Sequence, residues 1–104
     1  MNKKCLIKFE HDDYKDLMHY VVYDGDVVVL SREGSEKVRY IKKHGFLFIS
    51  FNIDSEKFEK LDVKVITDKE YVKKVYDYMI ETNNAYFKSG TDGLCAIKIL
   101  KNQK

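Results

Sequence analysis

The sequence predicts a mainly β protein in which an antiparallel sheet curls into a small barrel, with two helices covering its open ends. Three observations support this prediction. Apolar and polar residues alternate along several stretches, and Asp24-Gly25 is a strong hairpin signal between two apolar runs. Helical periodicity is confined to two stretches, which begin near Ser35 and Thr67.

Three strands are expected before the first helix. Cys5 to Glu10 alternates between two faces, and a polar turn at residues 11–16 follows it. Leu17 to Tyr23 is the second strand, and the Asp24-Gly25 turn leads into the third, which begins at Val27. These three strands are expected to form an antiparallel meander.

Three more strands follow, which makes six. They are Phe46 to Ile53, Phe58 to Ile66 and Leu94 to Leu100. The part of the fourth strand from Phe46 to Phe51 carries more apolar surface than one face of a small barrel buries, which favours association with a second copy of the chain.

Each predicted helix has its own start signal. Ser35 is placed to cap the first helix, whose Val38 and Ile41 share one face, and Gly45 is placed to end it. The second helix, Tyr71 to Glu81, follows Thr67-Asp68-Lys69-Glu70, which fits a capping box.

Length and charge limit the class of protein. With 104 residues the chain is expected to be a single domain, residues 1–104. Its net charge of +2 does not suggest nucleic acid as a partner, and no apolar run reaches the length of a membrane span. We expect a cytoplasmic, reduced protein in which Cys5 and Cys95 are packed thiols, and no spacing predicts a metal site.

The clearest candidate site lies where the third strand leads into the first helix. The strand ends at Ser31, and Ser35 and Lys37 then stand at the start of the helix. Backbone N–H groups at a helix N-terminus bind anions, and a hydroxyl and a lysine add to such a site. The alternative is an ordinary capped helix with a solvated basic face formed by Lys37, Arg39, Lys42 and Lys43.

This stretch resembles the pyridoxamine 5'-phosphate oxidase-like family of FMN-binding split barrels. The resemblance rests on the hairpin at Asp24-Gly25, the strand ending at Ser31, and Ser35-Glu36-Lys37 opening a helix that ends at Gly45. It implies a six-stranded antiparallel split barrel that forms a homodimer, with FMN bound at the dimer interface.

The resemblance also implies roles for individual residues. Ser31 would lie beside the flavin, Ser35 and Lys37 would hold the phosphate, and Arg32 in the intervening turn would contact the cofactor. The second strand of the family often supplies an arginine to the phosphate, and here that strand offers only His19. Tyr86-Phe87 would either cover the flavin ring or pack a loop against the barrel.

The function expected from these features is a small FMN-binding protein. It would be a flavin-dependent oxidoreductase acting on a small molecule, with the redox chemistry supplied by the flavin and with no catalytic side chain identified. The alternative is a non-enzymatic split-barrel dimer that has lost FMN and serves as a binding or structural module. Glu36, which stands where many members have arginine, and the lack of an arginine on the second strand favour this alternative.

Overall fold

The protein is described by a computed structural model that covers residues 6–11, 14–51, 57–82, 85, 87 and 90–100. These residues form seven strands and two helices. In chain order the elements are β1 (Leu6–His11), β2 (Tyr14–His19), β3 (Val21–Tyr23), β4 (Asp26–Arg32), α1 (Glu36–His44), β5 (Phe46–Ser50), β6 (Glu59–Ile66), α2 (Lys69–Glu81) and β7 (Leu94–Leu100).

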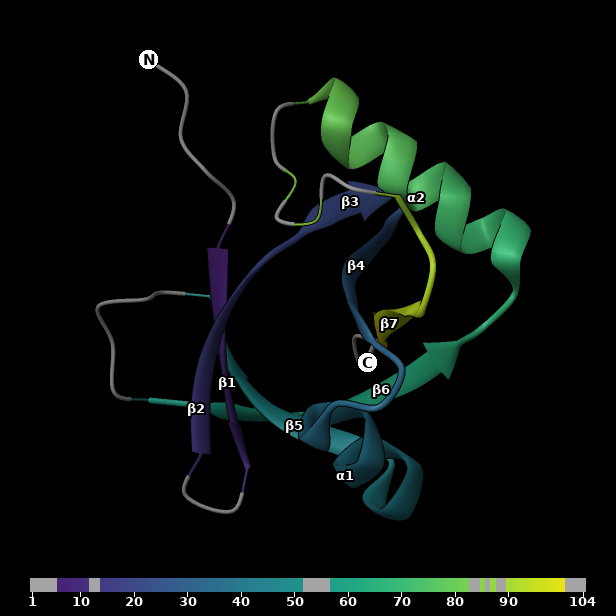
Figure 1. Cartoon of the computed structure of the whole chain (residues 1–104). Helices are drawn as coiled ribbons and strands as arrows, with labels where there is room; N and C mark the ends of the chain where they lie inside the picture. The colour runs from purple at the N-terminus through teal and green to yellow at the C-terminus, as the bar shows by residue number, and fades with distance from the viewer. Residues whose placement is uncertain are drawn as a thin grey trace.

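All seven strands belong to one antiparallel sheet, in the order β2-β1-β5-β6-β7-β4-β3. Figure 1 shows these strands curving around a common interior, so that the two ends of the sheet come back toward each other. The mainly β, antiparallel barrel predicted from the sequence is therefore confirmed.

The strand count differs from the prediction because the second strand divides at Tyr20. Its first part, β2, pairs with β1, and its second part, β3, pairs with β4 at the opposite end of the sheet. Both predicted hairpins are present, and the turn between β3 and β4 has the positive φ angles of a type I′ turn, 54° at Asp24 and 85° at Gly25. The expected three-strand meander is not continuous, because β2 and β3 stand at opposite ends of the sheet and the two hairpins are therefore not neighbours in the strand order.

The predicted polar turn at residues 11–16 was also too long. β1 continues to His11 and β2 begins at Tyr14, so Tyr14, Lys15 and Asp16 belong to the strand. Asp16 lies directly opposite Phe9 in the pairing of β1 with β2. Opposed residues of an antiparallel pair share a face of the sheet, and this places Asp16 on the side of a buried aromatic residue.

One core cluster fills the interior of the barrel. It takes alternate residues of β4 and β7, such as Val29 and Ile97, together with Val38 and Ile41 from α1. Since these side chains come from five strands and one helix, the cluster fixes both the curvature of the sheet and the place of α1.

A second cluster lies on the outer face of the sheet, under α2. The intervening residues of β4 and β7, Val28, Leu30 and Ala96, pack here against Val72 and Val75 of α2. β4 is thus buried on both faces, which explains its unbroken apolar run. The expectation that both helices cover barrel ends is wrong for α2, which lies beside β3 and β4 outside the ring of strands (Figure 1).

The helix ends follow local signals closely. The Ser35 hydroxyl accepts a hydrogen bond of 3.2 Å from the Val38 N–H, and Gly45 closes α1 with a φ of 82°. The second cap differs from the prediction by one residue. Asp68, and not Thr67, caps α2 and accepts from the Tyr71 N–H at 3.3 Å.

The remaining boundaries shift by a few residues. β5 ends at Ser50, while the predicted strand end at Ile53 lies outside the described residues. Phe46 and Phe48 are half-buried in a row of aromatic contacts, with ring centroids 5.6 Å apart, so the apolar surface of this strand is partly covered by the chain itself.

Cys95 is a fully buried free thiol in the first cluster, as predicted; Cys5 lies outside the described residues. Burial raises the pKa of the Cys95 thiol, the Glu33 carboxylate adds to the increase and Lys42 opposes it. The native state therefore keeps this proton to a higher pH than the unfolded state does, and the free energy of unfolding falls as pH rises through the ordinary thiol range.

This shift can be measured in a chain whose only thiol is Cys95. We expect Cys5→Ser to lose stability as pH rises above about 8 to 9, in urea titrations, more steeply than Cys5→Ser/Cys95→Ala does. Alkylation of Cys95 is expected to be slow until the chain unfolds. Equal pH slopes in the two variants, or rapid alkylation of the native protein, would contradict the buried position.

Candidate functional site

A pocket of about 310 Å³ lies at the predicted site, at the seam of the barrel where β2 approaches β4. We call it the seam pocket. Its lining comes from the middle of β2, the end of β4, the start of α1 and the loop before β7: Asp16, Leu17, Met18, Ser31, Arg32, Ser35, Lys37 and Phe87. The volume falls at the lower end of the range of about 300–1,000 Å³ that is typical of ligand pockets.

The pocket exists because the sheet does not close fully at this place. β2 and β3 are the two ends of the strand order, and β3 pairs with Asp26, Val27 and Val28 of β4. The second half of β4 faces β2, which approaches it without being its hydrogen-bonded neighbour in the described sheet. The break at Tyr20 thus leaves an opening beside Ser31 and Arg32.

Two serine hydroxyls form the first polar feature of the pocket. The Oγ atoms of Ser31 and Ser35 lie 3.1 Å apart, and the Ser35 Oγ also accepts from the Val38 N–H. Ser31 is 3% exposed. Helix geometry leaves the first N–H groups of α1 without a partner inside the helix, and Ser35 takes up that of Val38, so the two hydroxyls lie beside the N-terminus of α1.

A partly buried ion pair is the second feature. The Lys37 Nζ lies 2.7 Å from the Asp16 Oδ2, and the exposed fractions of the two side chains are 6% and 29%. The Lys37 Nζ also lies 6.0 Å from the centroid of the Phe9 ring. The prediction of a solvated lysine face is therefore wrong for Lys37, although Arg39, Lys42 and Lys43 are exposed.

Arg32 and Phe87 form the third feature. The Arg32 guanidinium carbon lies 5.3 Å from the centroid of the Phe87 ring, a distance suited to a cation–π contact. Phe87 also packs against the second core cluster, so it both packs the loop and lines the pocket; Tyr86 lies outside the described residues. Arg32 itself is exposed, and its charge faces solvent at the mouth of the pocket.

The structure brings together four of the five residues predicted from the sequence: Ser31, Arg32, Ser35 and Lys37. His19 does not belong with them. It ends β2 opposite Leu6 and is not among the described residues that line the pocket. Glu36 is exposed and is likewise not one of the described lining residues.

Sequence reasoning missed the contribution of β2, namely Asp16, Leu17 and Met18. The signal that could have revealed it is the register with β1, in which Asp16 opposes Phe9 and Met18 opposes Ile7. Both partners, Phe9 and Ile7, are fully buried. Residues two apart on a strand point to the same face, so Asp16 points inward as Met18 does.

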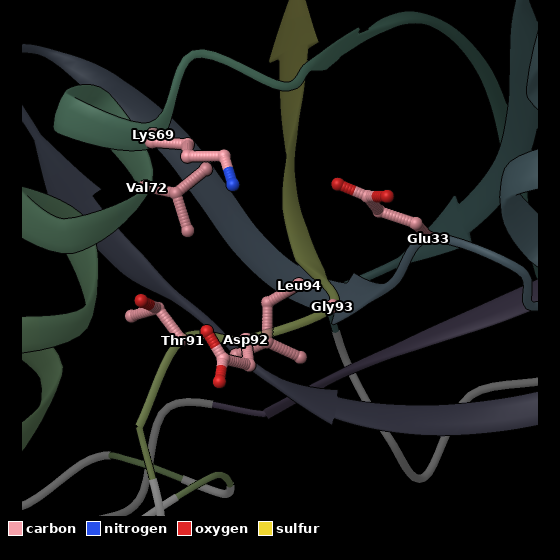
Figure 2. A pocket seen from close by; sticks show the side chains of 7 residues that line it. All are labelled: Glu33, Lys69, Val72, Thr91, Asp92, Gly93 and Leu94. Atoms are coloured by element: carbon pink, nitrogen blue, oxygen red, sulfur yellow. The ribbon is translucent and has the colours of Figure 1, made fainter.

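A second hollow lies between α2 and the start of β7, and Figure 2 shows Lys69 and Glu33 reaching toward each other from its two sides. Its volume of about 50 Å³ is far below that of a ligand pocket. Thr91 and Asp92 complete its polar lining. It is suited to water and not to a cofactor.

Two further findings concern other kinds of site. The described positions contain no group of three or more His, Cys, Asp and Glu residues that could hold a metal ion. Within the same residues, neither helix is both long and apolar enough to cross a membrane.

Comparison with known proteins shows which fold the chain shares with solved structures. No protein-family model matches the chain, and no curated protein matches it significantly in sequence. A proposed pyridoxamine 5'-phosphate oxidase from Listeria innocua has a TM-score of 0.62 at 12% identity, over 94% of this chain and 82% of that one. A conserved hypothetical protein, Rv2991, from Mycobacterium tuberculosis has a TM-score of 0.67 at 11% identity, over 98% and 74% of the two chains.

A third solved structure is that of a NimC/NimA family protein from Clostridium acetobutylicum. Its TM-score is 0.55 at 14% identity, over 92% of this chain and 71% of that one. Similarity at these identities shows a shared architecture. The chain is thus an antiparallel split barrel, the fold of these neighbours.

The partly buried ion pair predicts an asymmetric response to mutation. Lys37→Met leaves the Asp16 carboxylate without its partner and should cost about 2–3 kcal/mol in urea unfolding, less than a fully buried pair because Asp16 keeps some water. The double variant Asp16→Leu/Lys37→Met should recover most of this loss. Lys73→Met, which breaks the exposed pair of Lys73 with Asp77, is the matched control and should have little effect. A Lys37→Met variant as stable as this control would contradict the burial of the pair.

Proposed function

We propose that this protein binds FMN in the seam pocket and acts as a small flavin-dependent oxidoreductase. The observation that carries the proposal is the convergence of the Ser31 and Ser35 hydroxyls with the N-terminus of α1 and two cations in one pocket. FMN carries a phosphate dianion, and hydroxyls, free N–H groups and cations are the groups that bind one.

The residues present fit the cofactor in three respects. Ser31, Ser35 and the first N–H groups of α1 would hold the phosphate. Arg32 would add a charged donor from the mouth of the pocket, and Lys37 has three N–H donors, of which the contact with Asp16 uses one. Leu17, Met18 and Phe87 supply apolar lining suited to a ring system.

Bound FMN would supply the electron transfer itself. The chain would bind the phosphate, orient the ring at the seam and exclude water from it. The described lining residues include no histidine or cysteine, and the carboxylate of Asp16 and the ammonium of Lys37 are paired with each other. We therefore assign no catalytic role to a side chain of the pocket.

The proposal includes a homodimer in the cytoplasm. Leu17 lies at the rim of the seam pocket and is 51% exposed, which is high for a leucine beside a binding site. A second copy placed over this rim would cover Leu17 and enclose the pocket. The similarity in fold to a proposed pyridoxamine 5'-phosphate oxidase is consistent with this class of cofactor.

A second candidate function is a split-barrel module that has lost FMN and serves in binding or structure. The ion pair between Lys37 and Asp16 favours it, because a cation expected to bind phosphate already has a carboxylate partner. Under this alternative the pair would serve only to join α1 to β2 across the seam.

Titration with FMN and with riboflavin separates the two functions. We expect saturable FMN binding, followed by quenching of flavin fluorescence, with riboflavin weaker because it lacks the phosphate. Arg32→Gln should weaken FMN binding on the order of tenfold and leave riboflavin unchanged, since one charged hydrogen bond is lost. Lys42→Gln removes the same charge from the exposed face of α1 and should change neither ligand. No saturable FMN binding, together with no flavin in the protein isolated from cells, would favour the module.

A further inference from the structure

The seam pocket holds an acid at the place where a phosphate site needs cations. Asp16 lines the pocket together with Lys37 and Arg32, so the described charged lining is two cations and one anion. A carboxylate beside a phosphate group repels it, and here the carboxylate also takes up one of the N–H donors of Lys37.

Asp16 is held in this position by the fold. Its register opposite Phe9 places it on the inward face of β2, where Met18 packs against the barrel core. Its carboxylate lies 2.7 Å from the ammonium of Lys37, which is 6% exposed. The side chain of Asp16 is 29% exposed, so the carboxylate borders the pocket as well as the lysine.

A structural role alone does not require an acid here. An inward position of a strand is commonly apolar, and an apolar pair in place of a buried ion pair is often as stable. What the acid does change is the charge that an incoming anion meets, because it neutralises the most buried cation of the pocket.

We propose that Asp16 is a specificity-determining residue of the seam pocket that competes with phosphate for Lys37. This inference rests on the proposed function, in which the phosphate of the ligand approaches the ammonium of Lys37. Asp16 lowers the affinity of the pocket for ligands that carry a phosphate dianion. It leaves unchanged the affinity for neutral ligands with the same ring system. Binding of a phosphate requires the carboxylate to release at least part of its contact with Lys37.

The test compares FMN, riboflavin and inorganic phosphate as ligands of the full chain and of Asp16→Asn. The amide keeps the shape of the side chain and an oxygen that accepts from Lys37, and it removes the charge. We expect Asp16→Asn to bind FMN on the order of tenfold more tightly and to bind riboflavin as the unmodified chain does. Asp77→Asn, which removes the acid of the exposed pair with Lys73, is the matched control and should leave both affinities unchanged.

A double-mutant cycle with Lys37→Met tests whether Asp16 acts through Lys37. In the Lys37→Met background, Asp16→Asn should gain far less FMN affinity than it gains alone. If Asp16→Asn does not fold, the ¹³C resonance of the Asp16 carboxyl in the unmodified chain gives a second readout, and phosphate or FMN should shift it on binding. An unshifted resonance at saturation would overturn the proposal.

The remaining outcomes separate this proposal from the proposed function. If FMN binds and Asp16→Asn leaves its affinity unchanged, or tightens riboflavin equally, the competition is overturned and FMN binding stands. If neither flavin binds but Asp16→Asn gains inorganic phosphate binding over the unmodified chain, the competition stands and the proposed function fails. If no variant binds phosphate in any form, both are overturned.

Discussion

The division of one long strand at Tyr20 is the constraint on which the rest of the structure depends. Residues before Tyr20 pair with β1 and residues after it pair with β4, so a single stretch of chain supplies both ends of the sheet. This closes the barrel around one core without completing the hydrogen bonding between β2 and β4. The opening that remains is the seam pocket, and its position between β2, β4 and α1 follows directly from where the strand divides.

The seam also explains why polar groups lie so deep in a small barrel. Ser31 and Lys37 are among the few buried polar residues described, and both lie beside the opening. Each has a partner there: the Ser35 hydroxyl for Ser31 and the Asp16 carboxylate for Lys37. Buried polar groups need such partners, and these same groups are the ones available to a ligand that displaces them. Under the proposed function, stability and binding would therefore be coupled at this site.

Features that depend on neighbouring residues were predictable from the sequence. The Ser35 and Gly45 caps and the Asp24-Gly25 turn rest on contacts only a few positions apart, and so does the pairing of the Ser31 and Ser35 hydroxyls. The cap of α2 was misplaced by one residue because Thr67 and Asp68 are both good N-caps and only tertiary packing selects between them.

Features that depend on long-range pairing were not predictable in this way. Asp16 looks like a turn residue within a polar run, and its inward position follows from Phe9 on the neighbouring strand and from Lys37, which is 21 residues later. The division at Tyr20 has no local signal in Leu17 to Tyr23, since both halves read as one unbroken strand. The expectation for His19 depends on long-range pairing in the same way. The sequence predicts the strand that carries His19, but it does not predict the register of that strand against β1.

The most direct test of this account is an experimental structure of the chain crystallised with FMN. The account predicts a phosphate at the N-terminus of α1, in contact with the Ser31 and Ser35 hydroxyls, and an Asp16 carboxylate moved away from Lys37. A flavin bound elsewhere on the barrel, or a phosphate at this site with the 2.7 Å contact between Lys37 and Asp16 intact, would contradict it.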